Sequence, residues 1–153
     1  MRMLGIAILT MGLAQGASAQ QPLTAEPMFC EPASYPYDAV AAAPYSHRVL
    51  FEDEHVRILE INLPALATEP IHIHALPSVI MGETGGDGGG KFRYTQYRME
   101  NGKFVEVSHN DIEPTGGFRA VWSGPEGPHA ITNIGQVSVK FTRIEIKPES
   151  CAK

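Results

Sequence analysis

This 153-residue sequence is poor in basic residues, cysteine and long apolar stretches. It has 12 Lys and Arg against 17 Asp and Glu, and its formal net charge is −5. The basic residues form no cluster, so we expect no nucleic-acid partner. The sequence also lacks a P-loop, a dinucleotide-binding glycine motif and a Ser/His/Asp grouping. These absences leave the enzyme classes built on such motifs without support.

One apolar stretch stands out, at the N-terminus. Residues 4–13 are apolar and uncharged, they follow Arg2, and Ala-Ser-Ala at residues 17–19 forms a small-x-small cleavage site. This pattern predicts a secretory signal peptide over residues 1–19. The alternative is a membrane anchor, which needs roughly 20 apolar residues. We therefore expect a mature protein that leaves the membrane and is periplasmic or secreted.

Cysteine occurs only as Cys30 and Cys151. An even number of cysteines in an exported chain favours a disulfide. This bridge would join the two ends of the mature chain and close a loop that covers nearly all of it. The alternative is two unpaired thiols in flexible tails.

Glycine and proline are abundant, with 15 and 12 copies, which indicates short elements joined by tight turns. We expect an all-β fold with eight or more strands and no amphipathic helix. Asn101-Gly102 predicts a hairpin turn, and residues 83–90 a flexible tip. Residues 20–46, rich in Pro and Ala, predict an irregular arm over the barrel, and residues 47–150 predict the barrel domain.

Two local patterns predict irregular backbone. The apolar positions of residues 55–63 change face near Leu59, which predicts a bend or bulge in that strand. Residues 124–128 (Gly-Pro-Glu-Gly-Pro) predict a turn that ends before His129.

The sharpest chemical feature is His72-Ile73-His74. In a strand, residues i and i+2 point to the same face, so both imidazoles can share one metal ion at about 2.0–2.2 Å. His129 is the best candidate for a third ligand. The other histidines outside the motif, at turn-like or strand-edge positions, are expected on the surface: His47, His55 and His109.

These residues resemble the two motifs of the cupin family. The first motif places two histidines one residue apart, as His72 and His74 are, and usually a glutamate three or four residues on. The second motif resembles the segment that contains Pro125, Gly127, His129 and Asn133, although this segment has one residue fewer between Gly and His. The resemblance covers roughly residues 48–147. It implies an RmlC-like double-sheet jelly roll, or double-stranded β-helix, with a metal inside the barrel.

The sequence departs from the family at the glutamate, because Ser78 and Val79 occupy the expected positions. A three-histidine site without a carboxylate suits a divalent transition metal (Fe, Zn, Ni, Cu or Mn) rather than Mg or Ca. Three protein ligands leave open positions, as in catalytic sites. The missing glutamate also fits a cupin that has lost its metal.

Other residues are candidates for contacting a bound ligand. Ser78 shares the face of the two motif histidines and is a candidate for contacting bound water or ligand. Trp122 is a second candidate, although aromatic residues in a barrel are usually core. Glu69 is either a hydrogen-bond partner of a metal ligand or, as we expect, a solvated turn residue.

Two functions remain open. The first is a metal-dependent enzyme acting on a small organic molecule, either an oxygenase, as at ferrous centres of cupin dioxygenases, or a lyase or hydrolase. The second is a non-catalytic exported module that binds a metal or small ligand. We expect a small-molecule partner and leave a homodimer open. The fold alone does not decide between these functions.

Overall fold

The computed structural model describes residues 30–83, 90–113 and 117–152. The predicted signal peptide and residues 84–89 of the predicted tip lie outside the described residues. Nine strands occur within the described ranges: β1 (His47–Glu52), β2 (Val56–Leu63), β3 (His72–His74), β4 (Ser78–Glu83), β5 (Phe92–Glu100), β6 (Lys103–Ile112), β7 (Phe118–Ser123), β8 (Glu126–Asn133) and β9 (Val139–Ile146). Three short helical segments flank them: η1 (Pro32–Ser34), α2 (Ala39–Ala42) and η2 (Glu149–Cys151).

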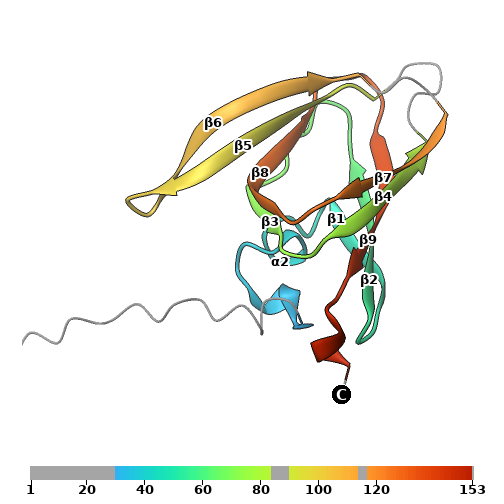
Figure 1. Ribbon diagram of the computed structural model, residues 1–153. Coiled ribbons are helices and arrows are strands. Elements are labelled where there is room, and N and C mark those ends of the chain that lie inside the picture. Colours follow the sequence, from blue (N-terminus) through green and yellow to red (C-terminus); the bar gives the residue numbers. More distant parts are fainter. Residues whose placement is uncertain (1–29, 84–89, 114–116, 153) are drawn as a thin grey trace, which may run out of the picture.

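The strands form two antiparallel sheets that enclose a barrel (Figure 1). One sheet has the order β1-β2-β9-β4-β7 and the other β3-β8-β5-β6. The pairs are nested: β5 pairs with β6, β4 with β7, β3 with β8 and β2 with β9. A long hairpin rolled upon itself produces this order, which is that of a jelly roll. The predicted all-β jelly roll is therefore confirmed.

The barrel interior changes character along β2 and β9. At one end, Leu63 faces Val139, and they join Ile131 in the apolar core together with Ala67, Phe92, Tyr94 and Phe141. At the other end, Arg57 faces Glu145, and neither is exposed to solvent. Apolar burial stabilises the first end, whereas charged groups fill the second.

The prediction of a bulge near Leu59 has the right place but the wrong strand, because the extra residue is on β1, beside Leu59, and not on β2. The β2–β9 register runs without a break, and Arg57, Leu59 and Ile61 all point inward. Hydropathy missed the pattern because the inward face includes a charged residue. The bulge lies instead in the β1–β2 pairing, between Val49 and Phe51.

The two turn predictions have different outcomes. Asn101 and Gly102 link β5 to β6 with φ angles of 50° and 76°, the left-handed backbone of a two-residue hairpin turn. That prediction is confirmed. The turn predicted over residues 124–128 is wrong in part, because β8 already begins at Glu126, where it pairs with His74. Strand pairing outweighs the turn preference of the Gly and Pro residues there.

The ends of the described chain are fastened to the barrel. Cys30 and Cys151 form a disulfide across 121 residues of sequence, which confirms that prediction. Tyr37 of the arm accepts a hydrogen bond through its backbone O from the Ile73 N–H of β3 at 2.7 Å, so the arm lies beside β3. Among the described residues, no helix has the length and apolar character required to cross a membrane.

Candidate metal centre

The register of β3 and β8 brings the three predicted histidines together. His72 is the Cα partner of His129, and His74 follows on the same face of β3. All three side chains are buried, with residue exposures of 0%, 2% and 2% for His72, His74 and His129. Their ring centroids lie 4.4–5.5 Å apart.

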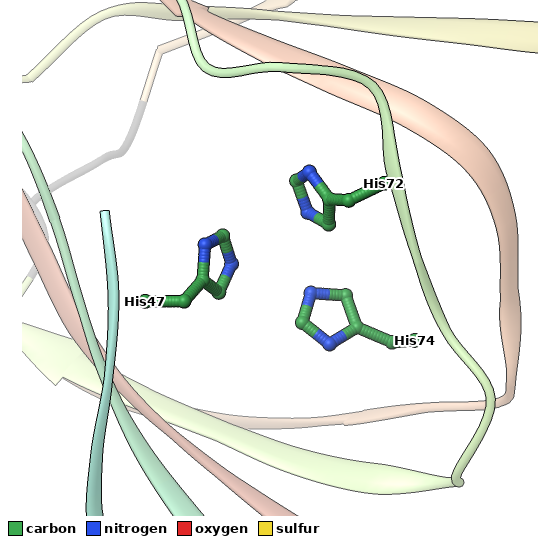
Figure 2. Close-up of side chains that lie close together, drawn as sticks. All are labelled: His47, His72 and His74. Carbon is green, nitrogen blue, oxygen red and sulfur yellow. The ribbon is translucent and has the colours of Figure 1, made fainter. Parts of the chain in front are cut away.

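A fourth histidine, His47, joins this cluster. Its ring lies 4.6 Å from that of His72 and 5.3 Å from that of His74, and Figure 2 shows it facing them across the barrel interior. The prediction of a surface position for His47 is therefore wrong. The rest of β1 is exposed, but its first residue is covered by the arm, which residue type alone does not reveal. His55 and His109 are exposed, as predicted.

Each imidazole is oriented through its Nδ1 atom. His72 donates to Pro70 O and His129 to Gly127 O, both at 2.9 Å. His74 donates to a carboxylate, Glu145 Oε1, at 2.7 Å. His47 Nδ1 lies 3.3 Å from Ala43 O. A proton on Nδ1 leaves the Nε2 lone pair available to a metal ion.

The cluster offers two overlapping sets of ligands. Ligand atoms of His47, His72 and His74 lie within 4.8 Å of one another, and so do those of His74, Glu126 and His129. His74 belongs to both sets. Glu126 was missed by the sequence analysis because it lies inside the second motif rather than after the first. Its carboxylate lies where it could offer an oxygen ligand, the type of ligand that the first motif lacks.

The donor set fits a divalent transition metal. The atom His72 Nε2 is buried and has no hydrogen-bond partner among the described residues. An unpaired buried nitrogen is costly unless something binds it. Neutral imidazoles with one carboxylate are the ligands that Zn, Fe, Ni, Cu and Mn accept in proteins.

Burial keeps the histidines neutral. Desolvation lowers the pKa of His47 to about 4 and that of His72 to about 2. It also lowers the pKa of His74 well below its usual value, with the nearby Arg143 guanidinium adding to the effect. The pKa of His129 is lowered by burial too. Neutral imidazole is the form that binds metal.

Glu69 lies inside this cluster rather than in solvent. It is 3% exposed, and its carboxylate accepts hydrogen bonds from Ser46 Oγ at 3.0 Å and from the Ile131 N–H at 3.2 Å. Its Oε1 atom lies 3.7 Å from His72 Nε2. Burial raises the pKa of Glu69 to about 7. The prediction of a solvated turn residue is wrong, because the arm covers this turn.

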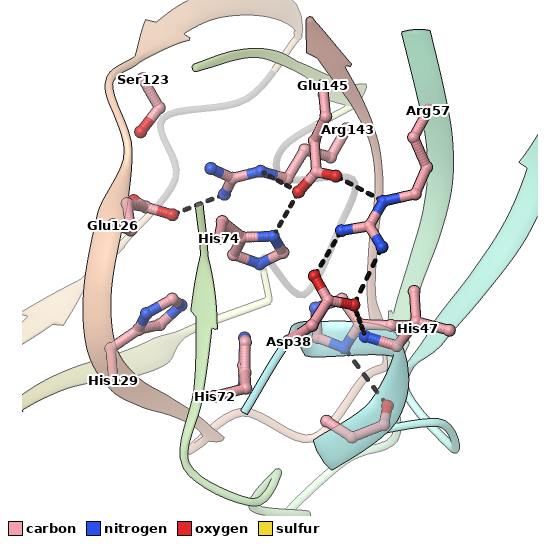
Figure 3. A network of polar contacts seen from close by, with 12 residues as sticks. Asp38, His47, Arg57, His72, His74, Ser123, Glu126, His129, Arg143 and Glu145 are labelled. Carbon is pink, nitrogen blue, oxygen red and sulfur yellow. Dashed lines mark hydrogen bonds and ion pairs between the residues drawn. The ribbon is translucent and has the colours of Figure 1, made fainter. Parts of the chain in front are cut away.

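A network of charged side chains, all buried except the half-buried Glu126, lies behind the histidines (Figure 3). Arg57 pairs with Asp38 and Glu145, both at 2.6 Å, and Arg143 pairs with Glu126 at 2.5 Å. Arg143 Nε also lies 3.7 Å from Glu145 Oε1. Arg57 and Glu145 are separated by 88 residues in sequence, and no local pattern announces their contact.

Ser78 and Trp122, the two residues predicted to contact a bound ligand, differ in position. Ser78 is fully buried, pairs with Glu145 across β4 and β9, and its hydroxyl oxygen has no hydrogen-bond partner among the described residues. It therefore remains a candidate for binding water or a ligand. Trp122 lies on β7 with 64% of its surface exposed, outside the histidine cluster.

A pocket of about 600 Å³ adjoins the cluster. Glu126 belongs both to the pocket wall and to one of the two ligand sets. Tyr94, also in the wall, stacks on His129 with ring centroids 4.9 Å apart. Burial raises the pKa of Tyr94 to about 12, so its hydroxyl stays protonated. The remaining described lining residues are Gln96, Tyr97, Val107, Ile112, Pro125, Gly127 and Pro128.

Asn133, the last residue of the second motif, has a structural role. It is fully buried, and its side-chain nitrogen donates to Leu63 O, Pro64 O and Val137 O at 2.8–3.0 Å. These contacts hold the loops at the apolar end of the barrel, away from the histidines.

Comparison with known proteins finds likeness in structure alone. No family model matches the sequence, and no curated protein matches it. Similar solved structures include a cupin domain from Bordetella pertussis Tohama I, with 19% identity, a TM-score of 0.46, and coverage of 67% of this chain and 92% of that one. An RmlC-like cupin from Methanocaldococcus jannaschii, described as a double-stranded β-helix, has 17% identity, a TM-score of 0.45, and coverage of 66% and 78%.

These likenesses are distant and carry no conclusion about activity. The fold is established by the chain's own strand pairing. Four nested antiparallel pairs form its two sheets, and the register of β3 and β8 brings both histidine motifs to one place inside the barrel. On this evidence the described part of the chain folds as a double-stranded β-helix, the jelly roll that the two histidine motifs predicted.

Proposed function

We propose that this protein is an exported metal-dependent enzyme that acts on a small organic molecule. The observation that carries the proposal is the cluster of four buried imidazoles, which form two overlapping sets of ligands around His74 beside a pocket. The disulfide supports export to an oxidising compartment, so we place the protein in the periplasm or outside the cell.

The histidines would hold the ion, with His74 as the shared ligand and Glu126 or His47 completing the set. A bound transition metal supplies Lewis-acid or redox chemistry. Iron would favour an oxygenase, and zinc a lyase or hydrolase. The protein's own contribution is orientation: Pro70 O, Gly127 O and Glu145 fix the rings.

Glu126 is the charged group best placed to contact a molecule in the pocket. Its carboxylate lies at the boundary between the histidines and the pocket, and Arg143 holds it there. A molecule in the pocket would meet this carboxylate and the phenol of Tyr94. The aliphatic and aromatic parts of the wall would exclude water from one side of the substrate.

The second candidate is a non-catalytic module that binds metal. The burial of the candidate ligands favours this function, because no histidine of the cluster is more than 3% exposed. Such burial limits the access of a substrate to the ion, as in structural metal sites.

Elemental analysis of protein purified from the exported fraction, without added metal, tests the proposal. We expect one equivalent of a transition metal per chain. The metal's identity then selects the reactions to assay. A protein that contains no metal and takes up none would overturn the metal-dependent proposal. A metal that stays bound but does not bind small anions such as azide would favour the non-catalytic binding module.

A further inference from the structure

His74 differs from its neighbours in the group that orients it. The rings of His72 and His129 are held by backbone carbonyls, whereas His74 donates to the carboxylate of Glu145 at 2.7 Å. The second oxygen of Glu145 accepts from Arg57 Nε at 2.6 Å. Both Glu145 and Arg57 are fully buried. The carboxylate is therefore held from both sides and cannot turn away from His74.

Arg57 is itself held by the N-terminal arm. Its two terminal nitrogens donate to the two carboxylate oxygens of Asp38, at 2.9 and 2.6 Å. Asp38 is 1% exposed and caps α2 by accepting from the Val40 N–H. Its backbone also forms a bridge with Ile73, which lies between the two motif histidines. A continuous line of buried contacts thus runs from the arm to His74 (Figure 3).

The charges of this network do not balance. It contains three carboxylates and two guanidinium groups: Asp38, Glu126, Glu145, Arg57 and Arg143. The carboxylates outnumber the guanidinium groups by one, and Glu145, which contacts His74, shares Arg57 with Asp38 and Arg143 with Glu126. An uncompensated buried charge is costly. A cation bound to His74 would supply the missing positive charge.

We propose that Glu145 is a positioning residue that strengthens metal binding through His74, and that Asp38 supports it through Arg57. The N-terminal arm is then part of the metal centre rather than a cover over it. The carboxylate fixes the ring and makes its Nε2 more basic, which strengthens the bond to a cation. This inference rests on the proposed metal site.

The test uses the full mature chain and Zn²⁺ as the probe. The dissociation constant is measured by competition with a chromophoric chelator for the wild type, Glu145→Gln and Asp38→Asn. We expect Glu145→Gln to weaken binding by about 10–100-fold, as for other carboxylates that orient metal-ligating histidines. Asp38→Asn should weaken it less. Each variant's Co²⁺ visible spectrum should shift, since the ligand field of His74 changes.

Glu60→Gln is the matched control. Glu60 also lies on β2, the strand that pairs with β9. Its carboxylate contacts two cations, Arg48 and Lys140, but at the barrel surface. This variant removes the same charge and should bind Zn²⁺ as the wild type does.

The outcomes separate this inference from the proposed function. Wild-type protein that binds no Zn²⁺ would overturn both. Tight binding by the wild type and equally tight binding by Glu145→Gln would overturn the inference alone, even if thermal stability falls. If Glu145→Gln fails to fold, judged by circular dichroism, Asp38→Asn decides: unchanged affinity and an unchanged Co²⁺ spectrum would overturn the inference.

Discussion

His72 and His129 are Cα partners across β3 and β8, and their rings lie 4.4 Å apart. One histidine comes from each of the two motifs, 57 positions apart in the sequence. Because paired residues of antiparallel strands project to the same face, this register suffices to place both motifs at one site. The site therefore depends on strand pairing as much as on the residues themselves.

The first prediction concerns His74. It belongs to both ligand sets, whereas His47 and His129 each belong to one. We expect His74→Ala to lower bound metal more than His47→Ala or His129→Ala does, by at least about tenfold in affinity. Metal content per chain, measured by mass spectrometry after equilibration with Zn²⁺, checks this. His109→Ala, at an exposed position, is the control. Equal losses in the three variants would contradict the two-set arrangement.

The second prediction concerns His47, which sequence reasoning had assigned to the surface. Its ring is buried against those of His72 and His74. We expect His47→Ala to weaken Zn²⁺ binding, while His55→Ala, on the exposed turn after β1, leaves it unchanged. Titration calorimetry of both variants distinguishes them. Wild-type affinity in His47→Ala would restrict the ion to the set that contains Glu126.

The third prediction concerns the disulfide. The bridge between Cys30 and Cys151 closes a loop that contains most of the chain. Its loss therefore raises the conformational entropy of the unfolded chain. We expect the double variant Cys30→Ser, Cys151→Ser to lose about 2–4 kcal/mol of unfolding free energy, measured in urea. Wild-type protein under reductant should match it. Identical stability with and without the bridge would contradict this expectation.

The fold was predictable because most strands carry a visible pattern. Alternation of apolar and polar residues predicted β5, and Asn101-Gly102 predicted the turn between β5 and β6. The histidines of β3 marked its inward face in the same way. These signals are local, so they survive in a single sequence.

The charged half of the site was not predictable for a physical reason. On β9 the apolar residues Ile144 and Ile146 draw attention to one face, yet Arg143 and Glu145 are the buried ones. A charged residue can point inward only when a partner compensates it. For Glu145 that partner is Arg57, on another strand. Hydropathy measures each residue alone and cannot detect such a pair.

The position of His47 was hidden for a related reason. Its burial depends on the arm, where Ala43 accepts from the His47 backbone N–H and is itself fully buried. The arm has little regular structure and no strong sequence pattern, so nothing local showed that it covers the start of β1.

The last prediction concerns pH and the metal-free protein. The pKa of His47 is lowered by burial from 6.5 to about 4. The unfolded chain therefore takes up a proton between these values while the folded chain does not. The stability that His47 contributes is complete above pH 6.5 and is lost as pH falls toward 4. The pKa of His72 is lowered to about 2, so its contribution to stability is also lost as pH falls.

Glu69 acts in the opposite direction. Its pKa is raised by burial from 4.5 to about 7, so its contribution is complete below pH 4.5 and is lost as pH rises through 7. Burial also raises the pKa of Glu145, which therefore acts in the same direction as Glu69. These two carboxylates oppose four buried histidines whose pKa values are lowered. We therefore expect the unfolding free energy of the metal-free protein to fall from pH 6.5 to 4.5. Urea titrations across this range check the sign.

A pair of variants separates the histidine contribution from other titrating groups. His47→Ala should flatten the pH dependence between 6.5 and 4.5, because one buried imidazole no longer resists protonation. His55→Ala, which removes an exposed imidazole, should keep the wild-type slope. The same low pKa values should let the site retain metal below pH 6, where an ordinary histidine site starts to lose it. A slope that His47→Ala leaves unchanged would mean that this imidazole is not held neutral inside the barrel.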